Sequence, residues 1–532
     1  MTYFTTHKTF FLVPLDDYDE EIRKIDFLLC ILEKSKVGDI IKKSNYKNEK
    51  LGRNSYNPYN LFSAIIFCFA FKKGTLRDIE EMCRYDVRLM YLMEQNTPSY
   101  KTISEFINEV ILPNTYEIFV TITETIITEL GLDISDQYVD GTKLEANANK
   151  YKFVWKPTKY HANLDKKIRE YLLTIDEEYT GNAQVKSHEL YSRIENYALR
   201  NKVDTVNIPT GKGKRKTYEQ KKYSKGFEYL KKLLEYEEKE RICGMNRNSY
   251  YRTDTDATAM ALKTDYYSGH GSNLHAAYNI QFIVSSGIVV FFGTFQDRTD
   301  YYTLIPLLEK YKIYYGYFPK NLCADSGYGI FDNYNFLKNN NIGNYIKMLS
   351  WNGEAKGSHP QLYLLNENED GFICIGGYEG VVVPFDSKHH QRQKNTKLYK
   401  FTGCNDCGFV YKCKEKMKDK TANFKKAELN LEFETMKDEA RKNLLSRKGI
   451  EIRVNRSIQA EGAFGQIKQN MGYIRLRRRG LDKVNCEIML VCLGRNIRKL
   501  FSWYGKNKID SKYWKLDEDI ACETFPIINP KM

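Results

Sequence analysis

The sequence has no apolar run long enough to cross a membrane. Its longest such run, residues 61–71, is about half of the roughly 20 residues that a spanning helix needs. The opening residues also lack a basic region followed by an apolar stretch and a small-residue cleavage site, so we expect no secretory signal. We therefore expect a soluble cytoplasmic protein with no membrane partner.

Closely spaced cysteine pairs are also scarce. Most of the 12 cysteines are scattered along the chain, which fits a reducing compartment better than a disulfide framework. The one cluster is Cys404-x-x-Cys407 with Cys413, and Cys374 lies upstream of it. Four thiolates can hold a structural zinc ion. A second CxxC is missing, however, and reduced, partly buried thiols are the alternative.

The length and charge of the chain bound its class. At 532 residues it exceeds what one core usually supports, and we expect about two to four structural units. A formal net charge of +14 favours a polyanionic partner, and nucleic acid is the usual one.

The pattern of apolar residues predicts four regions. An N-terminal helical domain covers residues 1–130, and its arginines suit the binding of DNA ends, although a plain support domain fits the same residues. The second region alternates strands and helices, and a charged helical insertion interrupts it. The third is too long for a loop and predicts a β-rich inserted subdomain. The last three regions are residues 131–350 with the insertion at about 156–252, residues 351–450, and residues 451–532.

Two aspartates lie at the ends of predicted strands. Asp140 is followed by Gly141 in the strand predicted at residues 136–145. Asp325 follows the buried-looking strand at residues 322–324 and precedes a Ser-Gly-Tyr-Gly turn. Other acids nearby are expected in turns and caps, above all Asp300, which precedes a predicted helix and suits its N-cap. The remaining acids of this kind are Asp136, Asp254, Asp256 and Asp297.

Residues 456–480 contain a single acid, Glu461, ahead of a basic run. As a helix from about Ser457, the segment places Glu461 and Lys468 on a common face beside an apolar stripe. The carboxylate can hold a metal ion and the lysine can meet a phosphate, whereas a surface helix with a solvated basic end is the alternative. The stripe is Ala460, Phe464, Ile467 and Met471, and the basic residues expected to bind DNA phosphates are Lys468, Arg475, Arg477, Arg478 and Arg479.

The elements follow one another as a strand with an aspartate, a hairpin, a helix, a strand with an aspartate, a helix, a strand and, much later, the Glu461 helix. This order resembles the ribonuclease-H-like catalytic domain of DDE transposases. The chain is most similar to the bacterial insertion-sequence transposases of the group numbered 1182, within the superfamily of insertion sequence 4. The segments that carry the resemblance are VDGTKLEANANKYKFVWKP, TDTDATAM, FQDRTDYYTLIPLLE, ADSGYG and EGAFGQIKQNMGYIRLRRRG, with GRNSYNPYNLFSAIIFCFAFKKGTLRDIEE and TISEFI near the N-terminus.

The resemblance implies an α/β fold with a mixed sheet and flanking helices, and a catalytic triad of Asp140, Asp325 and Glu461. Lys468 matches the lysine that follows the glutamate in the family. One departure is notable: the related signature has an arginine four residues before the glutamate, where this chain has Ser457, and the nearest arginines are Arg453 and Arg456.

The expected function is therefore DNA transposition. Three converging carboxylates suit two Mg²⁺ ions about 3.5–4 Å apart, for which Mn²⁺ can substitute, and Zn²⁺ is a further candidate at the cysteines. The expected partners are the terminal inverted repeats and the target DNA, bound by a homodimer at the nucleoid. The alternatives are a metal-dependent nuclease without strand transfer and an inactive DNA-binding regulator.

Overall fold

The computed structural model describes most of the chain, and its contacts divide the chain into two compact units. The described residues are 19–44, 55–72, 75–181, 184–209, 215–245, 247–263, 273–356, 361–385, 395–415, 417 and 419–504. The first unit comprises residues 1–144, 279–295 and 299–532, and the second comprises residues 145–278 and 296–298.

The first unit begins with a group of helices, as predicted from the sequence. They are α1 (Asp19–Lys34), α2 (Val37–Lys43), α3 (Pro58–Phe71), α4 (Leu76–Tyr85), α5 (Val87–Leu92), α6 (Tyr100–Phe106), the π-helix η2 (Ile107–Ile111) and α7 (Thr115–Leu130). Local chemistry fixes where they start. Thr75 and Asp78 form a reciprocal capping box at α4, and the Asn57 side chain accepts a hydrogen bond from the Tyr59 N–H at the start of α3.

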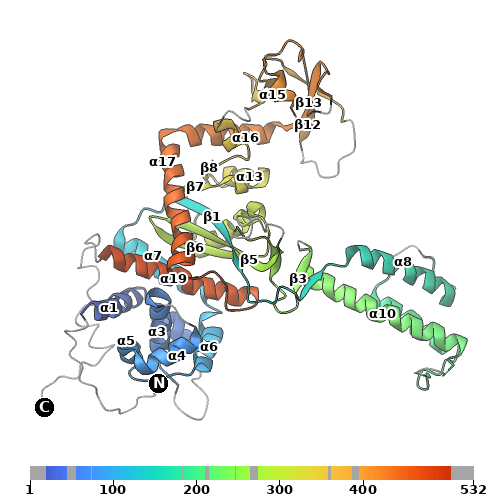
Figure 1. The fold of residues 1–532 in the computed structure, drawn as a ribbon, viewed down its shortest axis with the longest axis horizontal. Helices are drawn as coiled ribbons and strands as arrows, with labels where there is room; N and C mark the ends of the chain where they lie inside the picture. The colour runs from blue at the N-terminus through green and yellow to red at the C-terminus, as the bar shows by residue number, and fades with distance from the viewer. Residues whose placement is uncertain are drawn as a thin grey trace. The chain divides into compact units, whose positions relative to one another are not determined.

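A mixed sheet follows these helices in the sequence (Figure 1). Its strands are β1 (Asp136–Glu145), β4 (Thr258–Met260), β5 (His275–Ser285), β6 (Ile288–Phe295), β7 (Asn321–Ala324) and β8 (Gly343–Ile346). They follow the order β4-β5-β1-β7-β8, with β6 paired to β5. β1, β7 and β8 are parallel, whereas β5 and β6 form an antiparallel hairpin. The fold is therefore mixed α/β, and the strands predicted from the sequence are present.

The β5–β6 hairpin turns where the sequence predicts. Ser286 and Gly287 both have positive φ, 46° and 82°, which is the conformation that a two-residue hairpin turn requires. The next predicted helix is present as the 3₁₀ turn η3 (Asp300–Tyr302) and α12 (Leu304–Tyr315), and the one after β7 is α13 (Phe331–Asn339).

The last helix, α19 (Leu481–Tyr504), joins the N-terminal helices to the sheet. A Cβ at Gly494 would lie 2.5 Å from the Phe69 carbonyl group, so this glycine lets α19 and α3 approach closely. The Asn496 side chain of α19 exchanges two hydrogen bonds, of 2.7 and 2.9 Å, with the backbone of Val289 on β6. The sequence predicts Arg495, near the end of this helix, to be a surface charge, and this prediction is wrong. Arg495 is buried and donates to the Gly287 carbonyl at 2.7 Å.

An inserted β-rich segment separates β8 from the Glu461 helix. Its elements are α14 (Trp351–Ala355), β9 (Tyr363–Leu365), β10 (Phe372–Cys374), β11 (Gly380–Val383), β12 (Thr396–Thr402), α15 (Val410–Lys414), β13 (Phe424–Asn430) and α16 (Leu431–Leu445). β9 pairs with β10, and β11, β12 and β13 form an antiparallel sheet. Alternating apolar residues in the sequence also predict a strand at residues 427–433, and this prediction is wrong at its end. The Asn430 side chain accepts a hydrogen bond from the Phe433 N–H and starts α16.

The second unit contains a helical segment entered and left through a two-stranded ribbon, β2 (Phe153–Trp155) with β3 (Ser249–Tyr251). Its helices are α8 (Thr158–Ile175), α9 (Ser187–Arg200) and α10 (Tyr218–Cys243), which share one apolar core. The sequence predicts a hairpin of two helices here, and α9 adds a third. The sequence also predicts a solvated basic loop at residues 211–216, of which residues 211–214 lie outside the described ones.

Candidate catalytic site

Asp140 lies on β1, and Asp325 directly follows β7, the parallel strand next to β1. Tyr138 of β1 is opposite Cys323 of β7. Asp140 lies two residues after Tyr138, and Asp325 lies two residues after Cys323. Because side chains two residues apart point to the same face of a strand, both carboxylates leave the same face at the same level. The structure thus brings together two of the predicted site residues, although the sequence separates them by the whole second unit.

Asp325 also closes the turn after β7. Its Oδ1 accepts a hydrogen bond from the Gly327 N–H at 2.8 Å and starts the 3₁₀ turn η4 (Ser326–Tyr328). A Cβ at position 327 would lie 2.9 Å from the same oxygen. The Ser-Gly turn seen in the sequence therefore holds one carboxylate oxygen in a fixed orientation.

Asp300 lies close to this pair, and its predicted role as a helix N-cap is wrong. The residue that precedes η3 is Thr299, and the Asp300 carboxylate turns toward β5. Its Oδ1 accepts hydrogen bonds from Asn279 Nδ2 and Gln281 Nε2, both at 2.8 Å. Its Oδ2 lies 3.6 Å from the position that a Cβ would take at Gly327.

Tyr328 connects the three aspartates electrostatically. It is fully buried, and its hydroxyl donates a hydrogen bond to Gln281 Oε1. Burial raises the pKa of Tyr328 well above its ordinary value, and the charges of Asp300, Asp140 and Asp325 raise it further. The hydroxyl therefore stays protonated and remains a donor, which fixes Gln281 and, through its amide, Asp300.

The residues that could have indicated the role of Asp300 lie on β5. Asn279 and Gln281 are buried polar residues in a largely apolar strand, and buried amides need partners. Their partner is a carboxylate that no local pattern identifies. Gly141 belongs to the same arrangement, because a Cβ there would lie 2.2 Å from Gln281 Nε2 and 2.8 Å from Asp300 Oδ1.

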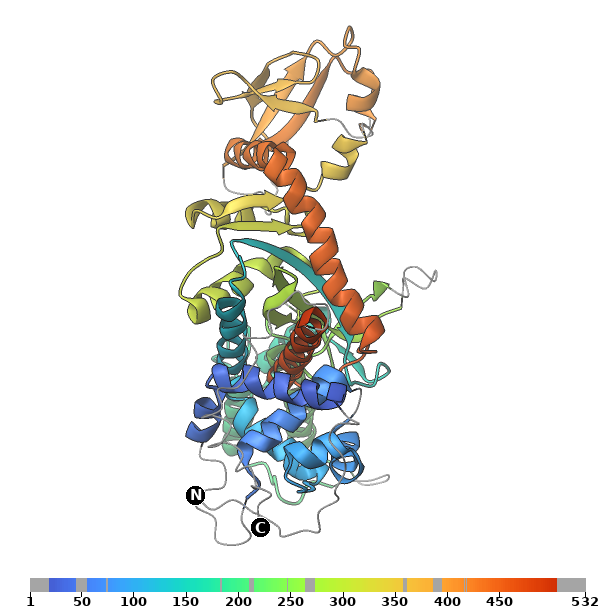
Figure 2. The ribbon, with the colours of Figure 1, turned by 90° about the vertical axis from the view of Figure 1, so that its left-hand side faces the viewer.

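Glu461 lies on a long helix that begins with α17 and contacts β7 and β8 (Figure 2). Its consecutive parts are α17 (Arg447–Arg456), the π-helix η5 (Ser457–Glu461), α18 (Gly462–Gly465) and the π-helix η6 (Gln466–Asn470). The predicted apolar stripe is buried, and Phe464 stacks on Phe282 of β5 with ring centroids 4.5 Å apart. The Glu461 side chain, in contrast, is 61% exposed.

Arg456 connects Glu461 with Asp140. Its Nη2 donates to Glu461 Oε1 at 3.3 Å, and its Nη1 lies 3.5 Å from Asp140 Oδ2. Only 8% of the arginine side chain is exposed, so the guanidinium is largely removed from solvent. It is a shared counter-charge for two of the three predicted triad residues.

The π-helix explains how Arg456 reaches Glu461 from five residues away. In an α-helix, residues four apart face each other, and position 457 is a serine. A π turn has i→i+5 bonds, so a residue five positions before the glutamate takes the facing place. The arginine that seemed displaced in the sequence therefore contacts the carboxylate.

Lys468 faces the strand that carries Asp140. Its Nζ donates to Thr142 Oγ1 at 2.5 Å, and Thr142 follows Asp140 by two residues, on the same face of β1. The ammonium thus lies beside the site, on the side of β1 toward which Asp140 points.

The basic run after η6 divides into two kinds of residue. Arg475 and Arg479 are exposed, and the Arg477 guanidinium lies over the Tyr473 ring, 5.5 Å from its centroid. Arg478 is turned inward: its Nη1 donates to Asn108 Oδ1 at 3.0 Å, and burial lowers the pKa of Arg478. Arg478 is thus a structural contact to the N-terminal helices.

Glu487 of α19 fixes the backbone of the same run. Its carboxylate accepts hydrogen bonds from the Arg477 and Arg478 N–H groups, both at 2.9 Å, and from the Tyr473 hydroxyl. Burial raises the pKa of Glu487 to about 7, while the two backbone hydrogen bonds lower it. A buried acid therefore anchors the segment that presents the arginines.

The donor set fits a hard divalent cation, although no part of the chain that the structure describes holds three His, Cys, Asp or Glu side chains at metal-binding spacing. Mg²⁺ prefers carboxylate oxygens. Asp140 and Asp325 offer them at one level of the sheet, whereas Glu461 is paired with Arg456.

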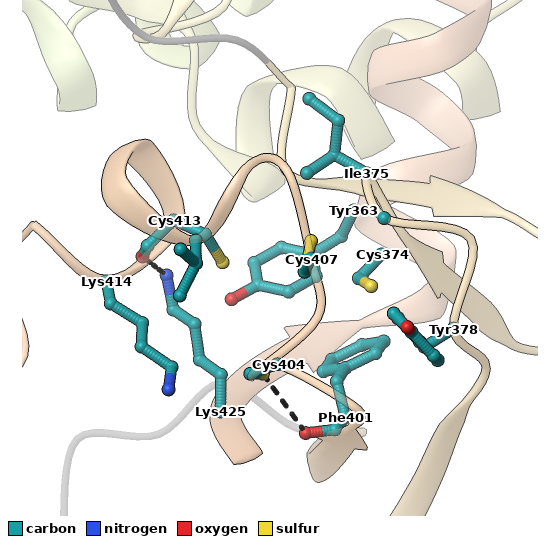
Figure 3. A pocket seen from close by; sticks show the side chains of 12 residues that line it. Tyr363, Cys374, Ile375, Tyr378, Phe401, Cys404, Cys407, Cys413, Lys414 and Lys425 are labelled. Atoms are coloured by element: carbon teal, nitrogen blue, oxygen red, sulfur yellow. Dashed lines mark hydrogen bonds between the residues drawn. The ribbon is translucent and has the colours of Figure 1, made fainter. Parts of the chain in front are cut away.

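The four cysteines of the predicted zinc site line one pocket in the inserted segment (Figure 3). Burial raises the pKa of the Cys404 thiol, the charge of Lys414 lowers it, and Cys413, Cys374 and Cys407 raise it. The thiols are therefore near enough to interact, although they are not at metal-binding spacing.

Two family models match the chain. Residues 378–501 match a transposase DDE domain, and residues 18–109 match a transposase domain of the type DUF772. No curated protein and no solved structure gave a match. Within the described residues, no helix has the length and apolarity needed to span a bilayer. The two matches support a DDE transposase, and transposase domains indicate DNA as the partner.

Proposed function

We propose that the chain is the transposase of an insertion sequence, which cleaves DNA strands at the ends of its element and joins the freed 3′-hydroxyl to target DNA. The observation that carries the proposal is the meeting of Asp140 and Asp325 on adjacent strands, with Glu461 tied to Asp140 through Arg456. The two transposase-domain matches support the same function from the sequence.

Asp140, Asp325 and Glu461 are the proposed ligands for two Mg²⁺ ions, with Mn²⁺ as a substitute. Such ions activate a water or a 3′-hydroxyl and stabilise the negative charge on the departing oxygen. Asp300 supports the set through Gln281 and Asn279, so its role is positioning.

The basic side chains of the site act on the phosphodiester. Lys468 contacts Thr142, which lies two residues from Asp140 on the same face of β1. From this position its ammonium meets a phosphate oxygen next to the cleaved bond. Arg456 neutralises Asp140 and Glu461 until the DNA and the cations are bound. Once Glu461 has left the guanidinium, the same arginine is available to a phosphate.

DNA binding rests on charge. Arg475 and Arg479 are exposed next to the Glu461 helix, and the chain has a net charge of +14. These residues contact phosphates and position the duplex without specifying its sequence. The terminal inverted repeats of the element are the proposed specific sites, and two copies of the chain hold the two ends together at the nucleoid.

The experiment uses the full chain with a labelled DNA that carries the ends of its own element, in Mg²⁺. The parent protein is expected to cut at the ends and join them to a second DNA. Glu461→Gln is expected to bind this DNA and to do neither. Glu451→Gln is the matched control, because Glu451 is an exposed glutamate on the same helix and is expected to keep both activities.

Three other results of this experiment would contradict the proposal or part of it. Cutting without joining identifies a metal-dependent nuclease. Binding without cutting by the parent identifies a DNA-binding regulator. Equal activity of the parent and Glu461→Gln removes Glu461 from the ligand set.

A further inference from the structure

The inserted segment has a small apolar core for its number of strands. The buried side chains shared by β10, β12 and β13 are Phe372, Tyr399, Phe401 and Leu429. Small β-rich units with so little buried apolar surface often depend on a cross-link or a bound metal for stability. The thiol-lined pocket lies against this core, since Phe401 contributes to both.

The four cysteines reach the pocket from three elements, as Figure 3 shows. Cys374 ends β10, Cys404 and Cys407 lie on the turn after β12, and Cys413 lies on α15. Cysteines from separate elements that surround one space can cross-link them through a common ligand.

Two tight turns bring the cysteines together. After Cys374 the chain turns back, with the Gly377 N–H bonded to the Cys374 carbonyl at 2.8 Å and Gly377 at a φ of 84°. The Cys404–Cys407 turn lies against it, because a Cβ at Gly376 would be 2.6 Å from Cys407 Sγ. Glycine at 376 therefore leaves room for a sulfur atom between the two turns.

Two lysines bring positive charge to the same pocket. Lys414 is 3% exposed, and its Nζ donates to the Ala422 and Lys420 carbonyls. Lys425 Nζ donates to the Cys413 carbonyl. Four thiolates around one divalent cation carry a net charge of −2, and two ammonium groups at the rim balance it.

We propose that Cys374, Cys404, Cys407 and Cys413 bind one structural Zn²⁺ ion, which cross-links β10, the turn after β12 and α15. The ligand class is a soft, tetrahedral divalent cation with four sulfur ligands, of which zinc is the usual one. Binding replaces the thiol protons, which pass to solvent, and no electron is transferred. The site goes beyond the proposed catalytic function and does not depend on it.

Closing the site requires the sulfurs to move inward. In the described residues no three such side chains stand at metal spacing, and a tetrahedral zinc–thiolate site places sulfurs about 3.8 Å apart. The proposal requires side-chain rotation to supply this movement. Cys404 Sγ, for example, has only a 3.9 Å contact with the Phe401 carbonyl to give up.

The test measures zinc in the full chain, purified under reducing conditions without chelator. We expect one zinc per chain, released by a thiol-modifying reagent, and an intense thiolate-to-metal absorption band when Co²⁺ replaces zinc. Cys404→Ser and Cys413→Ser are expected to lower zinc affinity at least about tenfold. Cys243→Ser, at a buried cysteine outside the pocket, is the control and is expected to keep the zinc.

Metal-free wild-type protein gives a second readout that needs no variant. Chelation is expected to make residues 363–430 more sensitive to protease, and added Zn²⁺ is expected to restore protection. The proposal is overturned if the purified chain contains no zinc and takes up no Co²⁺. It is equally overturned if Cys404→Ser retains full zinc. Strand-transfer activity is not part of this readout, so loss of the catalytic proposal leaves it intact.

Discussion

Arg456 and Asp140 form an ion pair, with Nη1 3.5 Å from Oδ2, between a helix and a strand that are far apart in the sequence. The same guanidinium donates to Glu461 at 3.3 Å. A cation of the protein thus stands between two carboxylates that we assign to metal binding. On the proposed metal assignment, a bound metal ion and Arg456 would compete for the same negative charge.

Arg456→Gln should therefore change how the fold responds to metal. Without the guanidinium, the facing carboxylates repel each other, and we expect the metal-free chain to lose about 1–2 kcal/mol of unfolding free energy. Added Mn²⁺ should then raise the melting temperature more in the variant than in the parent. The control is Lys448→Gln, which removes a lysine 3.2 Å from Asp136, outside the site. Equal metal-dependent shifts in parent and Arg456→Gln would contradict the assignment.

Asp300→Asn should weaken catalysis without preventing folding. The asparagine keeps one oxygen for the amides of Asn279 and Gln281 but removes the negative charge next to Asp325. Partners of metal ligands typically affect activity about 10–100-fold, and we expect a loss of that size together with a higher Mg²⁺ requirement. Cleavage rates measured across a Mg²⁺ series check this. Asp332→Asn, on the exposed start of α13, is the matched control, and a purely structural Asp300 would leave the Mg²⁺ dependence unchanged.

The arginines after η6 should separate into two classes. Arg475→Gln and Arg479→Gln are each expected to lower the slope of log affinity for DNA against log salt concentration by about 1. Arg478→Gln removes the hydrogen bond to Asn108 and should cost about 1–2 kcal/mol of unfolding free energy. Salt titrations of DNA binding and denaturant melts measure the two effects. The assignment of Arg478 to the structural class is contradicted if Arg478→Gln changes the salt dependence of DNA binding and leaves the unfolding free energy unchanged.

Glu487 should make stability depend on pH in the opposite sense to an ion-paired acid. Its pKa is about 7 in the folded chain against an ordinary value of 4.5, so the folded chain keeps a proton that the unfolded chain has lost. Its stabilising contribution is complete below pH 4.5 and is lost as the pH rises through 7. Relative to Glu487→Gln, the parent should lose about 3 kcal/mol over this interval. Denaturant melts at several pH values measure this difference, and parallel pH curves for the two proteins would contradict it.

Much of the fold follows from patterns within single segments. Asp140 and Asp325 are readable from the sequence because Asp140 interrupts a predicted strand just before Gly141, and Asp325 ends one just before a Ser-Gly turn. The structure then pairs these two strands. The apolar stripe beside Glu461 was equally readable, because burial of one helical face repeats at a fixed spacing. These predictions required no knowledge of distant contacts.

What the sequence did not reveal depends on contacts between segments. Asp300 reads as an N-cap until Asn279 and Gln281 of β5 are known to be its partners. Arg478 looks like its neighbours in the basic run, and only the position of Asn108 shows that it turns inward. The place of Arg456 opposite Glu461 depends on a π turn, which no residue pattern around Ser457 indicates.

The close packing of α19 on α3 at Gly494 has a consequence for how the chain can be divided. α19 is buried along most of its length, between the N-terminal helices and the edge strand of the sheet. A protein cut near residue 130 would leave that apolar helix in contact with water on one side. The N-terminal helices and the mixed sheet are therefore one folded body, and a force applied to either part is transmitted to the other.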